Sequence, residues 1–138
     1  MKAKLLVIEP DVFERDILSK VLSDRYDIYF SVNIKSAHET YQEVEPQIVL
    51  LHVQLPDIET LEEFCKIKKQ WQVGLPVILI ISENSLEFER YARTQNIFFY
   101  YMIKPYDFKE LEEVLVSAMR LSLKNKSNGE MPAAKEKM

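Results

Sequence analysis

Three polar side chains lie at the ends of apolar, strand-like segments, where they could take part in chemistry. They are Glu9 after residues 5–8, His52 within residues 48–53, and Lys104 after residues 98–103. In an open parallel sheet, ligands bind beyond the carboxyl ends of the strands, so these side chains are predicted to share one site. An imidazole there could bind a transition metal or accept a phosphoryl group. We therefore expect any reactive group of the protein at this edge.

These side chains need a scaffold, and the chain alternates between strand-like and helix-like segments. Short apolar or β-rich runs are typical of strands and fall at residues 5–8, 26–32, 48–53, 77–81 and 97–103. Apolar residues at helical spacing follow each run, at residues 12–23, 34–44, 61–71, 85–92 and 108–119. Parallel strands joined by helices require right-handed crossovers. The sequence therefore predicts an α/β fold, a three-layer sandwich with a five-stranded parallel sheet and five helices.

The first and last predicted helices carry the most detailed signals. The inner face of the first is expected to consist of Phe13, Ile17, Leu18, Val21 and Leu22. The last is expected to begin after Asp107, a good N-cap residue, while the polar run 82–85 offers caps to the fourth. After residue 123 the sequence is polar and has no apolar period. We therefore assign residues 1–123 to one domain and residues 124–138 to a polar tail or the start of a linker.

The composition excludes several classes of protein. A chain of 138 residues, 47% of them hydrophobic, fits one domain with a genuine core and not a disordered segment. A net charge of -4 gives no signature of nucleic-acid binding. No apolar run reaches the ~18 residues of a membrane span, and the first residues resemble the start of a strand rather than a signal peptide. We expect a cytoplasmic protein that binds neither membranes nor nucleic acid.

Two further residues with reactive side chains, Cys65 and His38, are expected to have structural roles only. Cys65 is the one cysteine of the chain, so it cannot form an internal disulfide. It occupies an apolar position of a predicted helix, which favours a buried, reduced thiol. His38 lies on the polar face of another predicted helix and is expected to be exposed to solvent.

Four segments, in this order and spacing, resemble the receiver domain of two-component response regulators. They are residues 7–11, residues 46–56, residues 76–79 and residues 101–105. The resemblance covers about residues 3–122, nearly the whole globular part. It implies a flavodoxin-like sheet with strand order 2-1-3-4-5, which suits five successive βα units.

The resemblance also implies a phosphorylation site. In the family, an acidic pair holds Mg²⁺, an aspartate attacks the phosphoryl donor, and a hydroxyl and a lysine steady the phosphate. Lys104 with Pro105 matches the lysine, and Glu9 matches the first acid. Pro10 occupies the second acidic position, and Asp11 follows it.

The central positions depart from the family pattern. His52 stands where the resemblance places the aspartate, and Ile81 stands at the hydroxyl position with Ser82 one residue later. Without a carboxylate at position 52 no acyl phosphate can form, and an imidazole suits Mg²⁺ poorly because this ion prefers oxygen ligands. We therefore expect no aspartyl phosphorylation, no metal or cofactor, and no enzyme activity. The degenerate pocket comprises Glu9, Asp11, His52, Ser82 and Lys104.

Two uses of this pocket remain open. His52 could fill it and form a hydrogen bond with Glu9 or with a backbone carbonyl, while Lys104 pairs with Glu9. Alternatively, His52, Glu9 and Asp11 could supply ligands to a metal, or the pocket could sense another small ligand. A flavodoxin-like enzyme is disfavoured because the chain lacks a glycine-rich phosphate loop.

Receiver domains signal through the surface formed by the fourth helix, fifth strand and fifth helix. By resemblance, this surface includes Tyr101, Arg90, Lys109 and Glu113. With no phosphate to bias its two positions, Tyr101 is expected to stay in one of them. The leading interpretation is a phosphorylation-independent protein-interaction module. Its partner would be a signalling protein, a fused output domain or a second copy of the chain.

Overall fold

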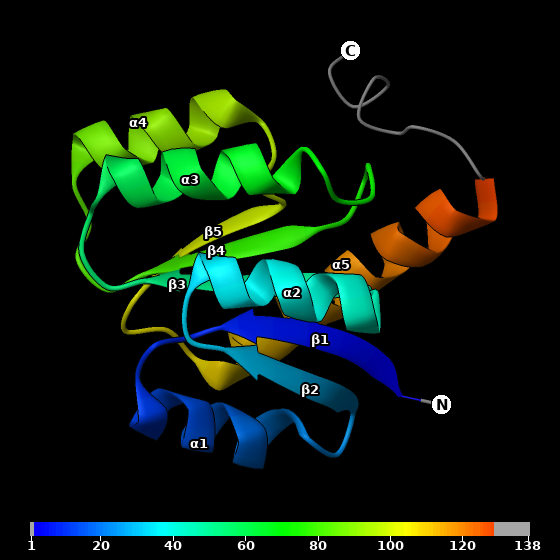
Figure 1. Ribbon diagram of the computed structural model, residues 1–138. Helices are drawn as coiled ribbons and strands as arrows, with labels where there is room; N and C mark the ends of the chain where they lie inside the picture. The colour runs from blue at the N-terminus through cyan, green and yellow to red at the C-terminus, as the bar shows by residue number, and fades with distance from the viewer. Residues whose placement is uncertain (1, 129–138) are drawn as a thin grey trace.

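A computed structural model describes residues 2–128, in which five strands and five helices alternate (Figure 1). The strands are β1 (Ala3–Ile8), β2 (Tyr26–Ser31), β3 (Ile48–Val53), β4 (Val77–Ile81) and β5 (Tyr100–Ile103). The helices are α1 (Val12–Leu22), α2 (Ile34–Val44), α3 (Ile58–Lys68), α4 (Leu86–Gln95) and α5 (Phe108–Asn128). In this part of the chain, no helix combines the length and apolar character needed to cross a bilayer.

The strands form one parallel sheet in the order β2-β1-β3-β4-β5, which confirms the predicted topology. The three central strands are buried on both faces, which explains their nearly continuous apolar sequences. The register pairs Ile8 with Leu51 and His52 with Ile80. The carboxyl ends of β1, β3 and β4 therefore lie at one edge of the sheet.

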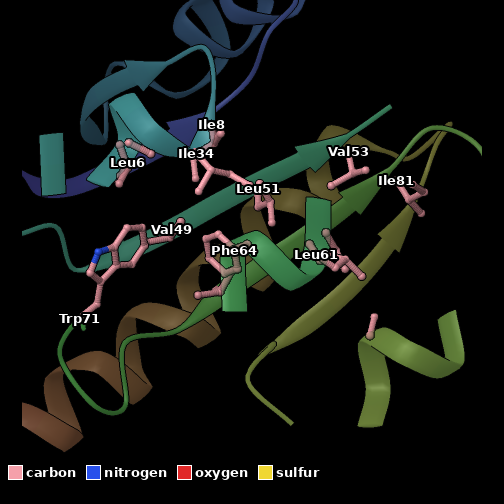
Figure 2. Packing of buried hydrophobic residues seen from close by; sticks show 14 of the residues in the cluster. Leu6, Ile8, Ile34, Val49, Leu51, Val53, Leu61, Phe64, Trp71 and Ile81 are labelled. Atoms are coloured by element: carbon pink, nitrogen blue, oxygen red, sulfur yellow. The ribbon is translucent and has the colours of Figure 1, made fainter. Parts of the chain in front are cut away.

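Helices cover both faces of the sheet and enclose two cores. On one face, α2, α3 and α4 pack over a cluster that includes Phe88 together with Leu61 and Phe64, the last two of which are labelled in Figure 2. Helices α3 and α4 lie side by side (Figure 1). On the other face, α1 and α5 contribute Leu18 and Leu111 to a second cluster. The predicted three-layer sandwich is therefore correct.

Side-chain caps fix where most of the helices begin. The carboxylates or hydroxyl of Asp11, Asp57 and Ser85 each accept a hydrogen bond from a backbone N–H in the first turn of α1, α3 or α4. Asp107 Oδ1 accepts a hydrogen bond from Lys109 N, as expected for the start of α5. The caps predicted at Asp107 and within residues 82–85 are confirmed.

The predicted inner face of α1 is wrong at two positions. Phe13 is 76% exposed and Ile17 is 40% exposed, whereas Leu18 and Leu22 are buried. At about 100° per residue, Leu18 and Leu22 share one side of the helix and Phe13 lies roughly 140° away from Leu18. The helix buries a narrower stripe than its apolar content suggests, and its first turn presents apolar side chains to solvent.

Several element boundaries also differ from the prediction, and α3 spans Ile58–Lys68 instead of residues 61–71. Strand β5 begins at Tyr100 instead of residue 97, after Asn96 adopts a left-handed conformation (φ 56°) that ends α4. Helix α5 continues to Asn128, past the predicted domain end at residue 123. Asn125 is buried there and donates a hydrogen bond to the Gly74 carbonyl oxygen at 2.9 Å, so a polar residue docks this part of the helix. Residues 129–138 of the predicted tail lie outside the described residues.

Cys65 and His38 both differ in exposure from the prediction, in opposite directions. Cys65 is partly exposed instead of buried, and burial still raises the pKa of its thiol. His38 is half-buried instead of exposed, because its Nδ1 accepts a hydrogen bond from Trp71 Nε1 at 2.9 Å and its ring stacks on the indole. Trp71 also stacks on Tyr41, so the histidine belongs to an aromatic cluster at the side of α2.

Candidate functional site

Three strand ends bring Glu9, His52 and Ser82 together at the carboxyl edge of the sheet. Glu9 Oε1 lies 2.6 Å from His52 Nδ1, and Ser82 Oγ lies 2.7 Å from His52 Nε2. The imidazole therefore bridges a carboxylate on one side and a hydroxyl on the other. The predicted hydrogen bond between His52 and Glu9 is confirmed.

Backbone hydrogen bonds continue the sheet past the strands and position these residues. Glu9 N–H donates to the Ser31 carbonyl oxygen at 2.8 Å, and Ser82 N–H donates to the Val53 carbonyl oxygen at 3.2 Å. Ile81, the predicted hydroxyl position, is fully buried in register with Val53. The hydroxyl that contacts the imidazole therefore comes from Ser82, one residue after the predicted position.

Glu9 is held from several directions and is only 1% exposed. Its Oε1 faces His52, and its Oε2 accepts a hydrogen bond from Asp11 N at 3.2 Å. Arg15 Nη1 donates to the Glu9 backbone carbonyl at 2.7 Å. In the part of the chain that the structure describes, no buried side-chain N or O atom lacks a hydrogen-bond partner. The pocket is thus internally satisfied, as a buried polar group requires.

Lys104 does not pair with Glu9, and that prediction is wrong. Its Nζ forms an ion pair with Glu14 in the first turn of α1, and both side chains remain partly exposed. The Glu9 carboxylate already has partners at both oxygens, so it offers the ammonium less than the more accessible Glu14 does. Glu14 was missed at the sequence level, where the one available signal was an acidic residue in the turn after Asp11.

Asp11 lies beside the pocket but serves the helix. Its Oδ1 accepts a hydrogen bond from Phe13 N at 2.9 Å and caps α1. Within residues 2–128, no group of three or more His, Cys, Asp and Glu side chains is placed to hold a metal ion. The arrangement of His52, Glu9 and Asp11 as three ligands therefore has no support in this geometry.

The residues present also fit Mg²⁺ poorly. This ion needs oxygen ligands in octahedral geometry, most often carboxylates and waters. Here Glu9 uses both oxygens within the protein, Pro10 has no side-chain ligand, and His52 supplies nitrogen where the family supplies oxygen.

Tyr106 is a further member of the site that sequence reasoning missed. Burial, together with the negative charges of Glu14 and Glu9, raises the pKa of its hydroxyl to about 12. Its ring packs edge-on against Phe108 with the centroids 5.6 Å apart. An aromatic residue two positions after a strand-end lysine was the only signal available, and it does not distinguish a pocket wall from a surface residue.

A pocket of about 340 Å³ opens next to His52 on the side of α2 and α3. Pro10, Val32 and Leu55 form part of its apolar wall, and Asp57 lies at its polar side. This volume lies at the lower end of the range for small-molecule sites, about 300–1,000 Å³. The prediction of a small-ligand sensor is not tested by this geometry and stays a prediction.

The predicted interaction surface is built around Tyr101 on β5. Its hydroxyl donates to Asn84 Oδ1 at 2.8 Å, and the Arg93 guanidinium carbon lies 5.3 Å from the ring centroid. Burial raises the pKa of the Tyr101 hydroxyl to about 12, with Glu89 adding to the effect. Tyr101 thus has side-chain contacts at both its ring and its hydroxyl, and the expectation that it stays in one position remains a prediction.

The other predicted members of this surface lie where the resemblance placed them. Arg90 is exposed on α4, and Lys109 and Glu113 are exposed on α5. Strand β5 is an edge strand of the sheet, and Tyr100 and Ile103 on it are 40% and 42% exposed. Edge strands with exposed apolar side chains are sites of association between chains.

Comparisons with known proteins agree with this architecture. No family model matches the chain. The chain is 29% identical over 117 residues to the transcriptional regulatory protein CrdR of Helicobacter pylori, an alignment that covers 81% of this chain and 53% of CrdR. The chain spans about half the length of the curated relatives it matches.

Solved structures show the same fold. NtrX of Brucella abortus superposes with a TM-score of 0.79 at 25% identity, covering 94% of this chain and 30% of NtrX. A CheY-like receiver domain protein of Methanospirillum hungatei gives a TM-score of 0.79 at 19% identity, covering 91% of this chain and 99% of that one. The fold is the flavodoxin-like fold of CheY-type receivers. This fold and the similarity to CrdR together support the interpretation of the chain as a receiver domain of two-component response regulators.

Proposed function

We propose that this chain is an atypical receiver domain that works without phosphorylation and signals through protein binding. The observation that carries this proposal is the His52 imidazole, which occupies the central cleft and bridges Glu9 and Ser82. Both of its ring nitrogens are engaged, and both oxygens of Glu9 have partners. The pocket is therefore complete without a phosphoryl group or a metal ion.

The same bridge supports a fixed signalling state. Receiver domains, which this chain resembles, couple a phosphate to a hydroxyl after the fourth strand. Here the imidazole already holds the Ser82 hydroxyl, and Asn84, two residues later, accepts the hydrogen bond from Tyr101. A two-state element needs a ligand with different affinities for its states. The surface of α4, β5 and α5 is then constant, and its partner binds whether or not phosphoryl donors are present.

Phosphoryl donors are expected to leave the native chain unchanged. Incubation with acetyl phosphate and Mg²⁺, or with beryllofluoride and Mg²⁺, should give no covalent or noncovalent adduct by intact and native mass spectrometry. The reason is that residue 52 has no carboxylate and the local carboxylates do not fit the metal. A stoichiometric adduct on the native chain would contradict the proposal.

The matched control restores the missing oxygen ligands. In Pro10→Asp/His52→Asp, two carboxylates join Glu9 at the edge of the sheet, so this variant is expected to bind Mg²⁺ and take up beryllofluoride. Because Lys104 is retained, a cation remains available to the bound anion once Glu14 is displaced. If only the variant forms an adduct, residues 10 and 52 are the reason that the native chain does not take up beryllofluoride.

We also propose homodimerisation through the surface of α4, β5 and α5. Leu86 and Ile103 on this surface are 62% and 42% exposed, and Arg90, Lys109 and Glu113 supply charges of both signs. The double variant Leu86→Lys/Ile103→Lys is expected to weaken self-association at least tenfold, measured by sedimentation equilibrium. Phe13→Lys on α1, which replaces a more exposed apolar side chain on a different helix, should leave it unchanged. A native chain that is monomeric at high concentration would contradict the dimer.

The likeness to transcriptional regulators supports two further parts of this proposal. CrdR is about twice as long as the matched segment, so a fused output domain is one partner that fits this chain. The relatives are bacterial transcriptional regulatory proteins, and bacterial DNA lies in the cytoplasm, which supports a cytoplasmic location for this chain. The domain itself is proposed to bind protein and not nucleic acid, in keeping with its net charge of -4.

A further inference from the structure

Glu9, His52 and Ser82 have a geometry that the proposed function does not use. We propose that they form a carboxylate–imidazole–hydroxyl relay that makes Ser82 Oγ a nucleophile, and that Ser82 is acylated by acyl groups carried on good leaving groups. Such relays are recognised by the contacts between the side chains rather than by sequence order. The inference goes beyond protein binding, since it assigns a covalent modification site to the pocket.

The proposal assigns the hydrogen of the neutral ring to His52 Nδ1. Glu9 Oε1 lies 2.6 Å from Nδ1 and Glu9 Oε2 accepts a hydrogen bond from Asp11 N, so we take the Glu9 carboxylate as the acceptor of the Nδ1 hydrogen. In the neutral ring, Nε2 then has a free lone pair directed at Ser82, 2.7 Å away. Ser82 O–H therefore donates to Nε2, which is the arrangement that a general base needs.

The base of the relay is more deeply buried than the residue that carries the nucleophile. The side chains of His52 and Glu9 are only 3% and 2% exposed, whereas Ser82 is partly exposed. In the proposal, the acyl donor approaches Ser82 from its partly exposed side while the imidazole behind it stays in a low-dielectric environment. Charge interactions are stronger in such an environment, so Glu9 stabilises the imidazolium that forms during the reaction.

The proposed step is a simple acyl transfer. Ser82 Oγ attacks the carbonyl carbon of an activated ester, and the hydroxyl proton moves to His52 Nε2. The new Oγ–C bond forms, the bond between that carbon and the leaving oxygen breaks with its electron pair, and the leaving group departs as an alkoxide or phenolate. The imidazolium then gives its proton to the leaving oxygen, and the ring returns to its neutral form. No oxidant, metal or cofactor is required.

The acyl group is expected to remain on Ser82. Hydrolysis would need a water molecule placed between the ester and Nε2, and the buried ring is poorly accessible to solvent. The chain should therefore be modified once per molecule without sustained turnover. Ser82 would then carry a stable covalent modification two residues before Asn84, which is hydrogen-bonded to Tyr101.

The test uses p-nitrophenyl acetate and the whole chain. We expect release of one p-nitrophenolate per chain, with one acetyl group located on Ser82 by peptide mass spectrometry. His52→Gln should slow the reaction by about 10²-fold, the lower end of what a general base contributes. Ser82→Ala should abolish the rapid phase and needs no change in the buried pair, so it remains informative even if the His52 variant fails to fold.

Ser85 is the matched control hydroxyl in the same loop. Its Oγ accepts a hydrogen bond from Phe88 N and has no imidazole partner among the contacts of the structure. Ser85→Ala should keep the native rate of Ser82 acetylation. Acetylation of Ser82 no faster than of Ser85, or an unchanged rate in a folded His52→Gln variant, would overturn the relay. Either result leaves the beryllofluoride test untouched, so failure here and failure of the proposed function are distinguishable.

Discussion

Replacing His52 by alanine is expected to lower the free energy of unfolding by about 3–5 kcal/mol, the usual cost of removing one partner of a buried pair. The variant leaves the Glu9 carboxylate, 1% exposed, without its imidazole, and it leaves Ser82 Oγ without its partner. Desolvation of the unpaired carboxylate accounts for most of the loss. Urea unfolding followed by circular dichroism measures the change.

Two comparisons separate the buried pair from charge pairing in general. Glu14→Ala breaks the ion pair with Lys104, whose side chain is 21% exposed, and should cost no more than about 1 kcal/mol. The double variant Glu9→Leu/His52→Leu removes both polar groups and should be more stable than His52→Ala, since no charge is left buried alone. A loss below about 1 kcal/mol in His52→Ala would mean that the pair contributes little to the fold.

Phe64→Ala in α3 is the second change with a large expected effect, a loss of about 3–5 kcal/mol. Phe64 is fully buried and lies at the centre of the core under α3, with Trp71 edge-on at 5.6 Å and Phe98 stacked at 6.0 Å (Figure 2). Truncation removes these contacts and leaves a cavity between α3 and the sheet. The midpoint of thermal unfolding and the urea midpoint should both fall.

Phe13→Ala is the matched control, because it makes the same chemical change in another helix. Phe13 is 76% exposed on α1, so its removal should change the free energy of unfolding by no more than about 0.5 kcal/mol. Equal losses in the two variants would contradict the burial assigned to α1. The pair of variants thus also tests the correction to the predicted inner face of that helix.

The local sequence determined the elements and their order. Apolar runs such as residues 48–53 and 77–81 became strands with the predicted bounds, because a strand covered on both faces needs continuous apolar side chains. Caps such as Ser85 also depend on near neighbours only, since their hydrogen bonds reach three residues along the chain. Five successive βα units predict a parallel sheet, and they therefore also predict that Glu9 and His52 lie at the carboxyl edge of that sheet.

The tertiary structure decided which side chains meet at that edge. Lys104 and Glu14 lie 90 residues apart in sequence, and their pairing depends on how α1 packs against the sheet. The contact between Ser82 and His52 joins the ends of two strands, and the backbone of Ser82 is hydrogen-bonded to Val53 next to His52. The exposure of Phe13 likewise depends on which side of α1 faces the core. Short-range patterns report periodicity and caps, whereas contacts between strand ends depend on register and packing across the whole sheet.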